Sequence, residues 1–268
     1  MSLPAPAPGS TALVTGASSG IGAEIARQLA RRGHALVLAA RRSERLEDLA
    51  SELASAHGIR SESVAVDLID PSARDALAAR IDELGLEVGV LVNNAGFGGG
   101  GECAQGDREY LVRMVRLNCE AVVDLQSRYL PGMVERGAGA VINVASTAAF
   151  QPLPGSAVYA ATKAFVLNLS EAAHAELKGT GVTVTAVCPG PVKTEFVQAA
   201  GLDAASGNLP GMFWTPVQTV ASEAVEGAAK GKRVVVPGVL NRAGAITGQH
   251  TPRAVALPVV KRIWRQAT

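Results

Sequence analysis

The sequence predicts an α/β fold: one domain with a doubly wound parallel sheet of about seven strands and helices on both faces. Three observations lead to this prediction. Short apolar patterns typical of strands alternate with helical patterns from residue 11 to residue 236. Apolar residues make up 48% of the 268 residues and charged residues 18%, as expected for strands that are buried on both faces. No linker or run of charge divides the chain, so we expect a single domain.

The first strand and helix enclose a glycine-rich turn. Residues 11–15 are apolar, and the turn GASSGIG at residues 16–22 leads into a helical pattern that ends at residue 33. Gly16, Gly20 and Gly22 stand where side chains would keep a pyrophosphate away from the backbone, just ahead of a helix N-terminus. The turn is therefore either a dinucleotide cradle or a glycine-rich turn without chemical importance.

Two more strand and helix pairs follow. The second strand, residues 35–40, is followed by a helix that Ser43 is expected to cap. The third strand, residues 61–66, ends at Asp67, and Asp70 caps the next helix. Because Asp70 has the capping role, Asp67 is either a ligand-binding carboxylate at the carboxyl edge of the sheet or a solvated loop acid.

The fourth strand, residues 88–92, runs into the polar bend at 93–96, which could pack the adenosine end of a cofactor. A helical pattern then extends from residue 107 to about residue 135 with Asn118 in its middle. An asparagine lowers helix propensity there. It either faces solvent or interrupts the helix to present polar atoms to a site.

The fifth strand, residues 140–145, carries Ser146 at its carboxyl end. The helix that follows, from residue 156 to about residue 178, places Tyr159 and Lys163 four residues apart on one face. A neighbouring ammonium favours the phenolate, so we expect Lys163 to lower the pKa of Tyr159 and make it an acid or base. The alternative is an amphipathic helix with a buried tyrosine and a solvated lysine.

The sixth strand, residues 182–187, leads into a segment that is long for a plain connector. A helix to about residue 231 and a last strand at residues 233–236 follow it. We expect a flap at about residues 191–215 that offers apolar surface to a substrate. Its apolar side chains are Phe196, Leu202, Leu209, Met212, Phe213 and Trp214.

We expect residues 1–10 to be a disordered lead-in, residues 11–240 the domain, and residues 241–268 a C-terminal extension that Pro258 splits. This extension is expected to pack on the domain or on a partner subunit, and the alternative is contact with a membrane surface. The net charge of +1 gives no indication of a nucleic-acid partner. The three cysteines have no metal-ligand spacing, and the absence of signal-peptide and membrane-spanning patterns predicts a cytoplasmic protein.

Six features occur in this order: TGASSGIG at 15–22, NNAG at 93–96, Asn118, Ser146, YAATK at 159–163 and PGPVKT at 189–194. Together they resemble the single-domain branch of the short-chain dehydrogenase/reductase superfamily, over roughly residues 10 to 240. The resemblance implies a Rossmann-type domain, a homodimer or homotetramer, and hydride transfer between a nicotinamide and a small carbonyl or alcohol substrate. It makes Tyr159 the acid/base, and it implies that Lys163 holds the nicotinamide ribose, Ser146 the substrate oxygen, and Asn118 a water.

Within this resemblance, Asp67 would bind the adenine and Thr194 would lie on the nicotinamide side. The residues expected to hold the dinucleotide, by this likeness and by the glycine turn, are Thr15, Gly16, Ser18, Ser19, Gly20, Ile21, Gly22, Asp67, Leu68, Asn94, Ala95, Gly96, Tyr159, Lys163, Pro189, Gly190, Val192 and Thr194.

The end of the second strand predicts the cofactor. Enzymes that use NAD usually place a carboxylate there for the ribose 2'-hydroxyl, whereas this chain has Ala40 followed by Arg41. Arg41, with Ser18, could bind a 2'-phosphate, so we expect NADP(H). Phe97 and Phe150 beside the site suggest a hydrophobic substrate. The alternatives are an NAD(H)-dependent secondary-alcohol dehydrogenase and a sensor that binds the dinucleotide without turnover.

Overall fold

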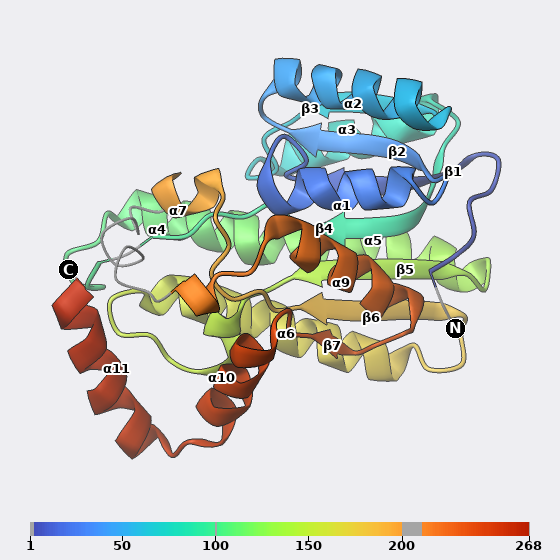
Figure 1. The fold of residues 1–268 in the computed structure, drawn as a ribbon. Coiled ribbons are helices and arrows are strands. Elements are labelled where there is room, and N and C mark those ends of the chain that lie inside the picture. Colours follow the sequence, from blue (N-terminus) through green and yellow to red (C-terminus); the bar gives the residue numbers. More distant parts are fainter. Residues whose placement is uncertain (1–2, 100, 200–210, 268) are drawn as a thin grey trace.

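A computed structural model describes residues 3–99, 101–199 and 211–267, with side chains at 199 and 263–267 left undescribed (Figure 1). Its centre is one parallel sheet with strand order β3-β2-β1-β4-β5-β6-β7. The strands are β1 (Ser10–Thr15), β2 (Ala35–Ala40), β3 (Ser61–Ala65), β4 (Glu87–Asn93), β5 (Gly139–Val144), β6 (Val182–Val187) and β7 (Val234–Val235). The predicted doubly wound sheet is confirmed, because strand order reverses between β1 and β4.

Helices cover both faces of the sheet (Figure 1). On one face α1 (Gly20–Ala30), α2 (Ser43–His57) and α9 (Val217–Ala229) pack against Val14 and its neighbours. On the other face α3 (Pro71–Glu83), α5 (Ala121–Glu135) and α6 (Ala157–Glu176) pack against Leu13 and its neighbours. Leu13 and Val14 are both fully buried, which explains why the strands are continuously apolar.

The two predicted caps have different outcomes. Asp70 accepts a hydrogen bond of 2.9 Å from the backbone N–H of Ser72 and caps α3, as predicted. The prediction for Ser43 was wrong, because α2 begins at Ser43 itself and Arg42 holds the capping position without a side-chain cap.

The long helical pattern after β4 is interrupted. It consists of α4 (Arg108–Val115), a π-helical turn η1 (Arg116–Glu120) and α5. Asn118 lies within the π-helical turn and is 1% exposed. Of the two alternatives for Asn118, the structure therefore has the one in which it interrupts the helix. Such wide turns are frequent at functional sites.

The remaining elements surround the carboxyl ends of the strands or extend beyond them (Figure 1). They are η2 (Thr147–Phe150), α7 (Glu195–Ala199), η3 (Gly211–Phe213), α10 (Val239–His250) and α11 (Arg253–Ala267). Leu202 and Leu209 of the expected flap lie outside the described residues. Pro258 does not split the tail as predicted, because it lies inside α11.

Two further observations concern the ends of the chain and its helices. In the expected lead-in, Leu3 packs against the core, and Gly9 accepts a backbone hydrogen bond of 2.8 Å from Glu87. No helix in the described ranges is both long enough and apolar enough to cross a membrane.

Candidate active site

A cavity of about 790 Å³ opens at the carboxyl edge of the sheet. This is where ligands bind in open α/β sheets. The structure brings most of the predicted site residues together on its wall. Those that line it are Gly16, Ser18, Ser19, Gly20, Ile21, Arg41, Asp67, Leu68, Asn94, Ala95, Gly96, Ser146, Tyr159, Lys163, Pro189, Gly190, Val192 and Thr194.

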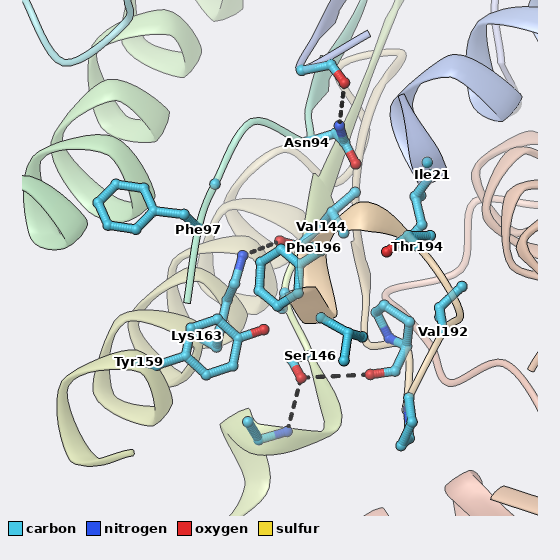
Figure 2. Close-up of a pocket in the computed structure, with 18 of the residues that line it drawn as sticks. Ile21, Asn94, Phe97, Val144, Ser146, Tyr159, Lys163, Val192, Thr194 and Phe196 are labelled. Atoms are coloured by element: carbon cyan, nitrogen blue, oxygen red, sulfur yellow. Dashed lines mark hydrogen bonds between the residues drawn. The ribbon is translucent and has the colours of Figure 1, made fainter. Parts of the chain in front are cut away.

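Ser146, Tyr159 and Lys163 converge on one side of the cavity (Figure 2). Tyr159 and Lys163 lie in the first two turns of α6, and Ser146 caps η2 directly after β5. The Ser146 hydroxyl accepts a hydrogen bond of 3.1 Å from the N–H of Ala148 and donates a long one of 3.5 Å to the carbonyl of Pro189. Because the donated bond is long, the hydroxyl hydrogen can turn to a ligand oxygen.

Lys163 is held by the strand beside it. Its ammonium donates a hydrogen bond of 2.9 Å to the carbonyl of Val144, and only 5% of the residue is exposed. Burial lowers the pKa of Lys163 to about 8. The nitrogen lies 5.8 Å from the centre of the Tyr159 ring.

The pKa of Tyr159 does not show the lowering that was expected from Lys163. Burial raises the pKa of Tyr159 to about 12, and the Ser146 hydroxyl is the group that opposes this rise. The reason is that the Lys163 ammonium points to Val144. Tyr159 is therefore a phenol that keeps its proton at neutral pH and can donate it.

Asn118 does not line the described cavity wall, but it bonds to residues next to those that do. Its amide oxygen accepts a hydrogen bond of 3.1 Å from the N–H of Phe97, and its amide nitrogen donates to the carbonyl of Phe97 at 2.9 Å. The same nitrogen donates to the Thr162 hydroxyl at 3.0 Å. The π-helical turn thus ties the loop after β4 to α6, next to Lys163.

The glycine turn has the expected shape. Gly16 and Gly20 have φ of 65° and 57°, in the left-handed region that favours glycine. A side chain at Gly20 would also meet Thr194, with the added carbon 3.3 Å from a methyl group. The turn therefore brings its backbone close to the loop after β6, and the cavity opens between them.

Thr15 and Gly22, two of the residues expected to hold the dinucleotide, do not line the described cavity wall. The Thr15 hydroxyl accepts backbone hydrogen bonds from Asn94 and Ala95, at 2.9 and 3.0 Å. A side-chain carbon at Gly22 would lie 2.4 Å from the Asn94 amide nitrogen. Both residues therefore hold the glycine turn against the loop after β4. At Gly22 it is the protein's own Asn94 that leaves no room for a side chain.

Asp67 and Leu68, in the loop after β3, line the cavity. Arg74, which is 2% exposed, donates a hydrogen bond of 2.8 Å to the carbonyl of Leu68 and also binds Asp124 and Glu120. Arg74 therefore holds this loop against α5 and η1. The sequence analysis missed Arg74, because nothing in a helical pattern distinguishes a buried arginine from a solvated one.

Arg41 and Arg42, at the end of β2, both line the cavity, and Arg42 is bonded to the glycine turn. Its guanidinium donates hydrogen bonds of 2.9 and 2.7 Å to the hydroxyls of Ser18 and Ser19. It also pairs with Glu195 at 2.7 Å. Arg41 lines the cavity too, and no hydrogen bond or ion pair of it occurs within the described ranges.

The other end of the cavity is apolar. The Phe196 ring lies 5.8 Å from the Tyr159 ring, and Figure 2 shows the two side by side. Helix α10 contributes to this end, which the sequence analysis missed because the tail lies beyond the recognised motifs. The apolar lining residues here are Phe97, Phe150, Leu153, Phe196, Phe213, Trp214, Leu240, Gly244 and Ala245.

The chain was compared with known proteins. A family model described as short chain dehydrogenase matches residues 10–205. Sulfoacetaldehyde reductase 2 of Chromohalobacter salexigens is 40% identical over 201 residues, which are 74% of this chain and 79% of that protein.

Solved structures with a similar fold include the following two. A short-chain dehydrogenase from Sphingobium yanoikuyae in complex with NADPH has a TM-score of 0.80 and 37% identity, and the match covers 93% of this chain and 95% of that one. The bulky-bulky ketone specific alcohol dehydrogenase from Comamonas testosteroni has a TM-score of 0.74 and 31% identity, covering 91% and 95%. With this family match, sheet order and site, the chain belongs to the short-chain dehydrogenase/reductase family and is an oxidoreductase that acts on CH–OH groups.

Proposed function

We propose that the protein is an NADP(H)-dependent oxidoreductase that interconverts hydrophobic carbonyl compounds and their secondary alcohols. The observation that carries this proposal is the cavity itself. It has the hydroxyls of Ser146 and Tyr159 between a basic, glycine-rich end and an apolar end. The two ends correspond to the two reactants that such an enzyme must hold next to one proton donor.

The residues at the basic end fit a dinucleotide with a 2'-phosphate. The left-handed glycines leave room for a pyrophosphate at the start of α1, and the Lys163 ammonium would hold the nicotinamide ribose. The guanidinium groups of Arg41 and Arg42, with the hydroxyls of Ser18 and Ser19, would hold the phosphate. The nicotinamide, when bound, supplies or accepts the hydride.

The protein's own groups would handle the oxygen and the proton. Reduction of a carbonyl develops negative charge on its oxygen, which hydroxyl donors stabilise. Ser146 would donate a hydrogen bond to this oxygen, and Tyr159 would donate its proton to it. Asn118 would keep its proposed role in a water link to Lys163, supported by its place in the wide turn beside Thr162.

The apolar end favours neutral, bulky substrates. The charged side chains among the described lining residues are Arg41, Arg42, Asp67, Glu195 and Lys163, and the first four lie at the basic end. The described residues that line the apolar end carry no cationic side chain, so they offer little to a substrate with a sulfonate, such as that named for the sulfoacetaldehyde reductase. The likeness to a bulky-ketone dehydrogenase agrees with this proposal.

The experiment is to measure kcat/KM for NADPH and NADH with a panel of aryl ketones and with sulfoacetaldehyde. We expect NADPH to be preferred by about ten- to a hundredfold, because charge-assisted hydrogen bonds to a phosphate each contribute about 1.5 to 3 kcal/mol. Arg41→Gln and Arg42→Gln should each reduce this preference. Higher kcat/KM for NADH would favour the NAD(H) alternative, and cofactor binding without turnover of any substrate would favour a sensor.

We also propose a homo-oligomer. Exposed apolar side chains on α4, α5 and α6 support it, since an exposed apolar surface often marks a protein interface. Light scattering at micromolar concentration should give a mass of two or four chains, and a monomeric mass would contradict the proposal. The exposed side chains are Val112, Val115, Val123, Val134 and Phe165.

A further inference from the structure

We propose that Glu195 is an internal competitor of the cofactor's 2'-phosphate: its carboxylate pairs with Arg45 and with Arg42, which is proposed to hold the phosphate, and it thereby weakens the hold on NADP(H). This inference rests on the proposed preference for NADP(H). It assigns to Glu195 a part in cofactor specificity.

The contacts of Glu195 are those of a bound anion. One carboxylate oxygen accepts a hydrogen bond of 2.7 Å from Arg42, and the other accepts one of 2.6 Å from Arg45. The two arginines hold the pKa of the Glu195 carboxyl at about 2, far below its ordinary value of 4.5. The carboxylate is therefore charged at every pH at which the enzyme would work.

The position of Glu195 in the chain makes this pairing a link between two parts of the cofactor site. Glu195 directly follows Thr194, which packs on Gly20, and it is 153 residues away from Arg42 in the sequence. It begins α7, and the next residue, Phe196, lies against the Tyr159 ring. The pair therefore joins the end of β2 to the loop after β6 across the cavity, whose lining includes both Arg42 and Glu195.

The Arg42 guanidinium cannot bind the Glu195 carboxylate and a phosphate equally well at the same time. Four of its five N–H donors are already used in hydrogen bonds to Ser18, Ser19 and Glu195. A 2'-phosphate that takes up Arg42 must displace the carboxylate or lie beside it, and two anions at that distance repel each other. Glu195 therefore opposes the binding of the phosphate and leaves a cofactor without that phosphate unaffected.

Exposure to solvent limits the effect of Glu195 on phosphate affinity. The side chains of Arg42, Glu195 and Arg45 are 42%, 48% and 50% exposed. Water and salt screen ion pairs of this kind, so removing the carboxylate should change phosphate affinity by about three- to tenfold. High salt should reduce the change.

The experiment compares wild type with Glu195→Gln by calorimetric titration with two small probes, adenosine 2',5'-bisphosphate and adenosine 5'-monophosphate. The matched control is Glu226→Gln. Glu226 is also 48% exposed and also pairs with two cations, Arg32 and Lys230, but it does not belong to the described cavity lining. Melting curves of all three proteins establish that they are folded.

We expect Glu195→Gln to bind the bisphosphate about three- to tenfold more tightly. Its affinity for the monophosphate and the affinities of the Glu226→Gln control should equal those of wild type. Unchanged or weaker bisphosphate binding by Glu195→Gln would overturn the inference, since Glu195 would then be neutral or would orient Arg42 for the phosphate. If wild type and Glu195→Gln each bind the two probes equally, the proposed NADP(H) preference itself fails, and the inference with it.

Discussion

The ammonium of Lys163 bonds to the main-chain carbonyl of Val144, the last residue of β5, at 2.9 Å. This bond fixes the first turns of α6 to the strand whose end carries Ser146, so the lysine, tyrosine and serine keep one geometry. A carbonyl is a neutral partner, however, and it does not fully replace the water that a buried ammonium loses. The lowered pKa of Lys163, about 8, follows from that loss.

This pKa predicts a pH dependence of stability. An unfolded lysine titrates near 10.5, so between pH 8 and 10.5 the unfolded chain holds a proton that folded Lys163 has released. The free energy of unfolding should therefore rise with pH in that window through this residue. Lys163→Met should lose this contribution. The difference in the free energy of unfolding between variant and wild type should therefore change by about 3 kcal/mol across the window. Urea unfolding at pH 7, 9 and 10.5 measures it.

The control for this prediction is Lys178→Met, which removes an exposed lysine. The pH dependence of its unfolding free energy should match that of wild type. A constant difference between Lys163→Met and wild type at all three pH values would show that Lys163 is not deprotonated in the folded protein near pH 8.

Tyr159→Phe removes the proton donor and leaves the ring in place. We expect kcat to fall by about 10²- to 10⁴-fold while cofactor affinity stays close to that of wild type. Single-turnover kinetics and a fluorescence titration with NADPH measure the two. Tyr129→Phe is the control, because the buried Tyr129 hydroxyl has no hydrogen-bond partner in the described structure and the residue packs in the core. Near-normal turnover by Tyr159→Phe would contradict its assignment.

Gly22→Ala tests the contact between the glycine turn and the loop after β4. The added carbon would lie 2.4 Å from the Asn94 amide nitrogen and 2.5 Å from the Gly16 carbonyl oxygen. We expect a loss of roughly 1 to 3 kcal/mol in the free energy of unfolding, as for other overpacked sites, and weaker cofactor binding. Gly211→Ala, where the added carbon would meet no described atom within 4 Å, should be close to neutral. Equal stability of both variants would refute the packing role.

Gly244→Phe tests the contribution of α10 to the apolar end. Gly244 lines the cavity, and no described atom lies within 4 Å of an added side-chain carbon. The phenylalanine ring should occupy space needed by a large substrate and raise KM for a diaryl ketone by about tenfold or more, with little effect on a small ketone. The control is Ala243→Phe on the exposed neighbour. An unchanged KM would show that substrates do not reach α10.

Much of this architecture could be predicted from local sequence patterns. The apolar runs predicted the strands of the sheet, and the spacing of Tyr159 and Lys163 placed them on one helical face. The hydrogen bonds from Arg42 to Ser18 and Ser19 could not be predicted, because they depend on how the start of α2 lies next to the glycine turn. Gly244 lines the cavity because α10 packs against η2. No local sequence pattern predicts this packing. The pKa of Tyr159 depends on burial in the folded chain and on the direction in which Lys163 points.

The π-helical turn around Asn118 has a consequence for insertions and deletions. Such a turn holds one residue more than an α-helical turn between the same flanking helices. Deleting one residue between 116 and 120 would let α4 and α5 join as one regular helix with their outer faces in register. That shorter chain would keep its sheet and its core but lose the amide bonds from Asn118 to Phe97 and Thr162. A regular α-helix through residues 116–120 would therefore be incompatible with the hydrogen bonds that Asn118 makes beside the site.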